Sequence, residues 1–116
     1  GAGLTSSRNL IGLYDAAGTL LRSAGDQTTV WNSTGAKTMA LSGSVSLAAG
    51  LYFVGLIATG STPPVFTASP TTNGTSSVGR SAAGWRGFTT TGPFTALPST
   101  RPTPTAAAIV PWVGLS

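Results

Sequence analysis

The fold is decided by residues 9–23, NLIGLYDAAGTLLRS, in which two short apolar runs flank a small turn. Residues 9–14 predict one strand and residues 19–23 predict a second, because both runs are short, apolar and bounded by turn-forming residues. The side chain of Asp15 can bond the backbone to open a turn, and Gly18 tolerates the positive φ that closes one. The stretch therefore predicts a β-hairpin.

A helix over residues 10–22 is the alternative for the same stretch. Gly12 and Gly18 would both lie inside that helix, where glycine is unfavourable. The stretch also lacks the capping residues that mark helix ends. We therefore expect the hairpin.

The strongest candidate for a central strand is LYFVGLIA, residues 51–58. It is rich in β-branched and aromatic residues and too short for a typical helix. Its unbroken apolar run predicts burial on both faces of the strand. Gly55 inside the run predicts a bulge or a close approach of another part of the chain.

Weaker patterns predict further short strands at residues 30–31, 36–42, 65–66, 84–90 and 106–113. The segment 36–42 alternates between its two faces with the period of a strand. Pro111 places the last strand at a sheet edge or a bulge. We expect residues 1–8 to be loosely held, and the Pro-rich segments 59–79 and 93–105 to be long extended loops.

The composition favours the all-β class. Gly, Ala, Ser and Thr make up 65 of the 116 residues, while charged residues make up only 7%. Disorder normally combines low hydrophobicity with high charge, whereas here 41% of the residues are hydrophobic. We expect a single all-β domain over residues 1–116, an antiparallel β-sandwich with long Pro/Thr-rich loops.

The sequence lacks the residues on which most enzyme sites depend. It contains no Cys and no His, and its only acidic residues are Asp15 and Asp26. These absences exclude Cys-His and Ser-His nucleophilic sites and zinc sites built from Cys and His. Two isolated aspartates also make a poor calcium site. We expect no enzyme activity, no cofactor and no metal ion.

The charges do not indicate a nucleic-acid partner or a membrane span. The net charge is +4, and the basic residues are spread along the chain: Arg8, Arg22, Lys37, Arg80, Arg86 and Arg101. Nucleic-acid-binding proteins gather their basic residues on one face, so we expect no nucleic-acid partner. The longest nearly apolar run covers residues 47–58 and is too short for a membrane-spanning helix of about 20 residues, so we expect no membrane insertion.

Two motifs resemble one protein family when taken in order. The motif GLYD at residues 12–15 is followed by a small turn and a Leu-Leu pair, and GLYFVGL at residues 50–56 is followed by a Pro-Pro loop. This pattern resembles the jelly-roll-like β-sandwich domains of tail fibre and minor tail proteins from phages of actinobacteria. The resemblance covers residues 9–66, and the order and spacing of the motifs carry it.

The resemblance implies a structural virion protein on the phage particle surface or tail, a receptor-binding module that acts in assembly and in adhesion to the host. The implied partners are two further copies in a homotrimer, other virion structural proteins and a host cell-envelope glycan. Domains of this family carry more strands before the first hairpin. We therefore expect either a longer chain of which this is the C-terminal part, or a partner sheet from a neighbouring subunit. The alternatives are a capsid decoration or head-fibre protein and a bacterial carbohydrate-binding module.

The residues themselves also predict an oligomer. The strand over 51–58 is apolar on both faces, and the other apolar segments of the chain are few. They can cover one face, and the remaining exposed patch would favour association. We therefore expect that the chain does not fold as an isolated monomer.

The candidate ligand-binding residues are Trp31, Asn32, Trp85 and Arg86. Each of these two tryptophans is followed by a polar residue, and a ring with polar neighbours suits the binding of a sugar. The alternative for each ring is packing in the core or at a subunit interface.

Overall fold

The computed structural model describes residues 2–62, 64–65, 68–70, 88–89, 94–101, 105–106 and 109–111. The chain divides into two compact units, of which the first comprises Gly1–Val65 with Pro93–Arg101 and the second comprises Phe66–Gly92 with Pro102–Ser116. Among the described residues every strand pair is antiparallel and no α-helix occurs. The predicted all-β class is therefore confirmed, and the stacking of two sheets into a jelly-roll-like sandwich stays a prediction.

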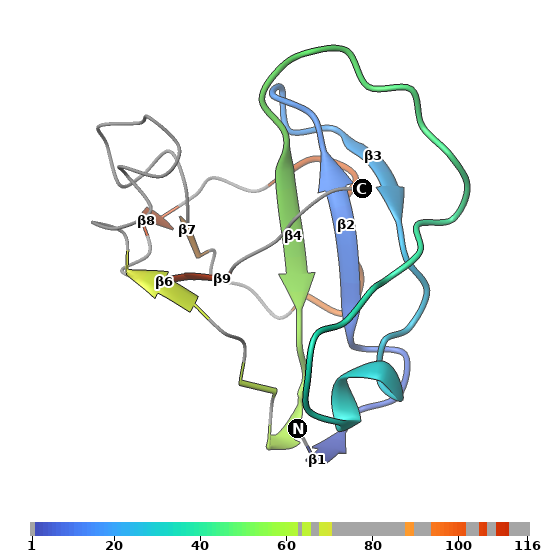
Figure 1. Cartoon of the computed structure of the whole chain (residues 1–116), viewed down its shortest axis with the longest axis vertical. Coiled ribbons are helices and arrows are strands. Elements are labelled where there is room, and N and C mark those ends of the chain that lie inside the picture. Colours follow the sequence, from blue (N-terminus) through green and yellow to red (C-terminus); the bar gives the residue numbers. More distant parts are fainter. Residues whose placement is uncertain are drawn as a thin grey trace. The chain divides into compact units, whose positions relative to one another are not determined.

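The first unit is built on a three-stranded sheet with the order β3-β2-β4 (Figure 1). Its strands are β2 (Leu10–Tyr14), β3 (Leu20–Ser23) and β4 (Phe53–Ile57). The hairpin and the strand within residues 51–58 are thus confirmed. Among the described residues β2 is the central strand and β4 lies at an edge, so the central position expected for that strand is not found in this part of the chain. The burial follows the same order, since four of the five β2 residues are buried and every β4 residue is half-buried.

The turn between β2 and β3 forms as the sequence predicts. The backbone N–H of Gly18 donates to the carbonyl of Asp15 over 3.0 Å, and the Asp15 carboxylate accepts from the N–H of Thr19 over 2.8 Å. Gly18 has a φ of +91°, a left-handed conformation that side-chain-bearing residues rarely adopt. The two residues named from the sequence therefore open and close this turn.

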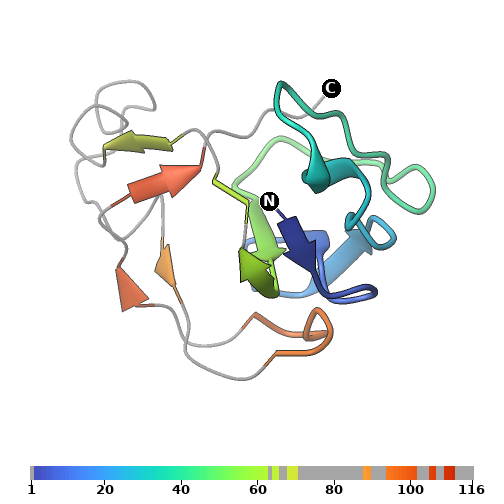
Figure 2. The ribbon, with the colours of Figure 1, turned by 90° about the horizontal axis from the view of Figure 1, so that it is seen from below.

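Two irregular segments cover opposite faces of the sheet, as Figure 2 shows. Residues 94–101 lie on the face of Gly12 and Tyr14, where Leu97 approaches Gly12 and the Tyr14 hydroxyl donates to the Pro98 carbonyl over 3.0 Å. The long connection between β3 and β4 lies on the other face, which carries the buried side chains of Ile11 and Leu13. The core of this unit is therefore closed by loops rather than by a second sheet of the described residues.

The N-terminal segment is more ordered than we expected for residues 1–8. β1 (Ala2–Leu4) pairs with β5 (Gly60–Thr62), with Ala2 opposite Thr62 and Leu4 opposite Gly60. The N–H of Thr5 extends this pairing by donating to the carbonyl of Thr59 over 2.8 Å. Its partner β5 lies within residues 59–79, which were predicted to be a long loop. Neither β1 nor β5 has a sequence pattern that predicts a strand.

Two predicted strands between β3 and β4 do not form. Residues 30–31 belong to a short 3₁₀ helix, η1 (Val30–Asn32), in which the N–H of Trp31 donates to the carbonyl of Gln27 over 2.9 Å. Residues 36–42 are irregular, and Ser42 alone contributes a backbone bond to the sheet, from its N–H to the Ser23 carbonyl. The alternating pattern of residues 36–42 does not produce a strand, because one of its two faces consists of Ala, Thr and Ser. These side chains bury too little apolar area to hold a strand in a sheet.

The second unit contains two short strand pairs. β6 (Ala68–Pro70) pairs with β9 (Ile109–Pro111), and β7 (Phe88–Thr89) pairs with β8 (Thr105–Ala106). Strands were predicted over 84–90 and 106–113, and among the described residues β9 belongs to a two-stranded sheet, which agrees with the edge position predicted for Pro111. The strand predicted at residues 65–66 is not found at Val65, which is irregular and 98% exposed, and Phe66 lies outside the described residues.

Candidate functional site

The side-chain amide of Asn9, a residue that is 0% exposed, bonds to three separate segments of the chain. Its Nδ2 donates to the carbonyl of Thr5 over 2.8 Å and to the hydroxyl of Thr28 over 2.9 Å. Its Oδ1 accepts from the N–H of Thr59 over 3.0 Å. One side chain thus joins the ends of β1 and β4 to the loop after β3, and no motif around Asn9 predicts this role.

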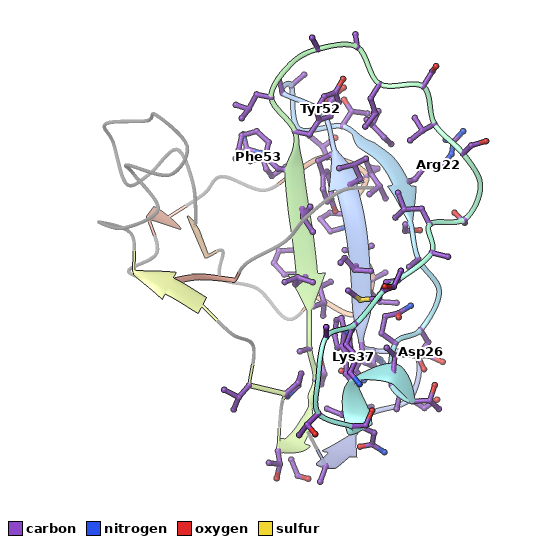
Figure 3. All side chains as sticks on the ribbon, viewed as in Figure 1. Arg22, Asp26, Lys37, Tyr52 and Phe53 are labelled. Carbon is purple, nitrogen blue, oxygen red and sulfur yellow. The ribbon has the colours of Figure 1, made fainter. Side chains whose placement is uncertain are left out.

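Asp26, which Figure 3 labels, is an exposed residue that bonds to Asn9 and Thr28. Its Oδ1 accepts from the Thr28 hydroxyl over 2.8 Å and from the N–H of Asn9 over 3.4 Å. A backbone hydrogen bond from Ser7 has the largest effect and lowers the pKa of Asp26, aided by the bonds from Thr28 and Asn9 and opposed by partial desolvation. The carboxylate is therefore held ionised as an acceptor of structural hydrogen bonds, which does not suit a proton donor in catalysis.

Asp15 and Asp26 serve separate structural roles. Asp15 accepts from Thr19 within the β2–β3 turn, whereas Asp26 bonds the segment before β2. Within the described residues no group of three or more His, Cys, Asp or Glu side chains is placed to hold a metal ion. The same residues include no helix that is long and apolar enough to cross a bilayer.

Trp31, the first of the candidate ligand-binding residues, is a core residue in this structure. Its side chain is 2% exposed, and its indole N–H points to the sulfur of Met39 over 3.2 Å. A stacking platform needs an open ring face, which this burial does not leave. Asn32 follows at the surface as the last residue of η1. The structure therefore separates the ring from the polar neighbour with which it was grouped.

The other two candidates, Trp85 and Arg86, lie outside the described residues. Their assignment as ligand-binding residues stays a prediction from their sequence context. The structure therefore gives no arrangement in which all of Trp31, Asn32, Trp85 and Arg86 form one site.

Arg101 has a structural role that the sequence did not show. Its guanidinium carbon lies 4.6 Å from the centroid of the Phe53 ring at the start of β4, within the range of a cation–π interaction. Its Cβ also lies 3.1 Å from the position that a Cβ on Gly18 would occupy. The N–H of Arg101 donates to the Gly18 carbonyl, so this arginine fixes the end of the segment 94–101 against the hairpin turn.

Comparison of the chain with models of protein families, with curated proteins and with solved structures found no match.

Proposed function

We propose that this chain is a non-enzymatic structural protein of a bacteriophage virion, a tail fibre or minor tail module that acts in assembly and in host-surface adhesion. It would occupy the surface or tail of the particle. The proposal begins from the motif resemblance, and one structural relationship supports it most directly.

That relationship is the pairing of the two motifs with each other. The motif at residues 12–15 lies on β2 and its turn, and the motif at residues 50–56 includes most of β4. Gly12 is opposite Gly55, and Tyr14 is opposite Phe53, in one antiparallel pair. The two motifs on which the resemblance rests therefore form one paired unit of the sheet.

The low charge of the chain supports a role in an assembly. Only 7% of the residues are charged, well below the quarter that is typical of globular domains. Among the large apolar side chains that the structure describes, Val65 is 98% exposed and Leu47 is 40% exposed. Contacts with further copies of the chain and with other virion structural proteins would bury such groups, and the resemblance implies a homotrimer.

Adhesion is assigned to the pair Trp85 and Arg86, with a host cell-envelope glycan as the ligand. Trp31 is buried, and Asn32 beside it offers a polar group but no ring, so the stacking platform falls to the remaining candidate tryptophan. An aromatic face stacks on the C–H groups of a sugar, and a neighbouring guanidinium can bond its hydroxyls.

Immunogold electron microscopy of the phage particle tests the virion assignment. An antibody raised against the 116-residue chain should label the tail or its fibres in purified particles. Label confined to the capsid would replace this proposal with a capsid decoration or head-fibre role. Particles without label, from lysates in which the chain is present, would reject a virion role, and binding of the free chain to polysaccharide would then favour a carbohydrate-binding module.

Adhesion is tested separately by the variant Trp85→Ala. Loss of ring stacking should weaken binding to purified host cell walls by about 1–3 kcal/mol, a magnitude taken from ring stacking on nucleic-acid bases. The circular dichroism spectrum should be unchanged. The matched variant Asn32→Ala removes an exposed polar side chain beside the buried Trp31 and should bind like the wild type. Equal binding by a folded Trp85→Ala variant would remove this residue from the adhesion site.

A further inference from the structure

The two outer strands of the β3-β2-β4 sheet differ in what lies along their edges. The edge of β3 is partly covered, because the N–H of Leu20 donates to the Ser99 carbonyl over 2.8 Å and the N–H of Ser42 donates to the Ser23 carbonyl over 2.8 Å. An isolated bridge between Thr19 and Thr100 extends this cover. The described residues provide no comparable cover along β4.

The hydrogen-bond pattern shows which groups of β4 point outward. The carbonyl of Ile11 accepts from the N–H of Ala24, so the backbone groups of Ile11 face the β3 side. Since backbone groups alternate along a strand, those of Gly12 face β4, where its partner is Gly55. The neighbours of Gly55, Val54 and Leu56, therefore direct their N–H and C=O groups away from β2. No backbone group among the described residues bonds to these outward groups.

This edge lacks the features that keep exposed edges from pairing. Protein edge strands are commonly protected by a charged side chain, a proline or a bulge. β4 has the sequence FVGLI, without charge or proline, and it pairs with β2 in unbroken register. No charged residue occurs between Lys37 and Arg80. In Figure 3 the labelled side chains of Arg22 and Asp26 lie toward the β3 side of the sheet, whereas Phe53 lies on the β4 side.

We propose that the edge of β4 pairs antiparallel with β4 of a second copy of this chain, about a two-fold axis through Gly55. Val54 of each copy would then exchange both backbone hydrogen bonds with Leu56 of the other, which gives four bonds across the axis. The two sheets would join into one with the order β3-β2-β4-β4-β2-β3.

The sequence of β4 suits a copy of itself better than an unrelated strand. At a two-fold axis a residue meets its own counterpart, and Gly55 has no side chain to collide there. The flanking pairs would be Val54 with Leu56 and Phe53 with Ile57. All four residues are apolar, and apolar side chains directly opposite each other stabilise a strand pair. The chain carries a net charge of +4, and no residue of β4 is itself charged, while the Arg101 guanidinium lies over the Phe53 ring at the start of the strand.

This inference does not rest on the virion role, and it differs from the homotrimer that the resemblance implies. An isologous two-fold contact produces an even number of copies. The assembly expected in solution is therefore a dimer of twice the 11.5 kDa chain mass rather than a trimer.

Amide hydrogen exchange combined with sedimentation equilibrium tests the pairing in the wild-type chain. Exchange at Val54 and Leu56 should slow as the protein concentration is raised, in step with the appearance of dimer mass, while exchange at Gly55 should be slow throughout. Slow exchange at Val54 and Leu56 in a monomer at every concentration would overturn the proposal, because the chain itself would then cover the edge. Fast exchange at every concentration, or a mass of three chains, would overturn it as well.

The variant Val54→Pro removes the outward N–H and leaves the bonds to β2 in place, because a proline is tolerated where the N–H of an edge strand is not used in the ladder. It should raise the dimer dissociation constant by about tenfold or more, since one donor is lost from each copy. Val54→Thr is the matched control, because it keeps the branched side chain and the N–H, and it should associate like the wild type. Equal dissociation constants for a folded Val54→Pro variant and the control would overturn the pairing. The wild-type exchange experiment decides the matter without any variant.

Discussion

The Tyr14 ring lies directly against Gly55 on the neighbouring strand. Its Cε2 atom is 2.8 Å from the position that a Cβ on Gly55 would occupy. Real Cβ atoms essentially never approach a neighbour so closely, so any side chain at this position must displace the ring. The ring itself is 3% exposed and bonded through its hydroxyl to Pro98, which restricts its ability to move.

Gly55→Ala should therefore destabilise the first unit by about 1–3 kcal/mol, the usual cost of overpacking a filled core. The matched control is Gly25→Ala, because a Cβ on Gly25 meets nothing within 4 Å. That substitution should be neutral or stabilising by up to about 1 kcal/mol through the unfolded state. Urea unfolding with unchanged m-values measures both. Equal midpoints for the two variants would mean that the ring is not held in place.

Removal of the Asn9 amide should be among the most damaging single changes. Asn9→Ala leaves the Thr59 N–H without its partner in a part-buried cluster, at about 1–3 kcal/mol for an unsatisfied group, whereas the Thr5 carbonyl keeps its bond from the Arg8 N–H. Asn32→Ala, at an exposed position, should change the free energy of unfolding by less than about 0.5 kcal/mol. Chemical denaturation compares the two. A mild loss for Asn9→Ala would show that water replaces the amide.

Ionisation of the Tyr14 hydroxyl should lower the stability of the folded protein at alkaline pH. Burial raises the pKa of Tyr14 above its ordinary value of 10.0. The unfolded chain then loses this proton first as the pH rises, so stability is fully present below pH 10.0 and falls between that value and the raised folded pKa. Tyr14→Phe should lower stability at neutral pH by about 1 kcal/mol, through loss of the bond to Pro98, and should flatten the alkaline fall.

Unfolding free energies measured from pH 7 to 11 for the wild type and Tyr14→Phe check both effects. Tyr52→Phe is the control at neutral pH. Its hydroxyl bonds the Ala48 carbonyl only four residues away, at an exposed position, so its loss should cost less. Parallel alkaline curves for the wild type and Tyr14→Phe would contradict the role assigned to burial.

Protonation of Asp26 should contribute to a loss of stability at acid pH. Hydrogen bonds, led by that from the Ser7 backbone, lower its pKa below the ordinary 3.8. The unfolded chain takes up this proton first as the pH falls, so the contribution to stability is present above pH 3.8 and is lost as the pH falls through the lowered folded pKa. The effect should be small because Asp26 is exposed and water screens it. Asp26→Asn should make the free energy of unfolding less dependent on pH between 2 and 5, and an unchanged slope would contradict this assignment.

The elements that the sequence predicted are those with local signals. The hairpin follows from Asp15 and Gly18 at fixed positions in a tight turn, and β4 follows from a dense run of β-branched and aromatic residues. The pairing of β1 with β5 could not be predicted in this way. It joins Ala2 to Thr62 across most of the first unit, and neither three-residue strand has a pattern of its own.

The side chains that organise the first unit were harder to find than its strands. Asn9 has no capping or ligand motif around it, and its role depends on three segments that meet only after folding. The contact of Arg101 with Phe53 likewise joins residues far apart in sequence. For Trp31 both outcomes were foreseen, and its 2% exposure favours the packing alternative over ring stacking. Whether a residue is buried depends on which distant segments of the chain pack over it after folding. Composition and the spacing of residues do not predict that packing.

The return of residues 94–101 to the first unit has a consequence for the order in which the protein is made. The ribosome must synthesise all of Phe66–Gly92 before Leu97 and Pro98 can reach the sheet formed by β2, β3 and β4. The bond from Tyr14 to Pro98 closes a loop of 84 residues, so the face bearing Gly12 stays open until late in translation. Non-local closure of this kind slows folding. During synthesis the nascent chain therefore presents an apolar sheet face that chaperones can bind, and a ribosome stalled before residue 94 would hold the protein in that state.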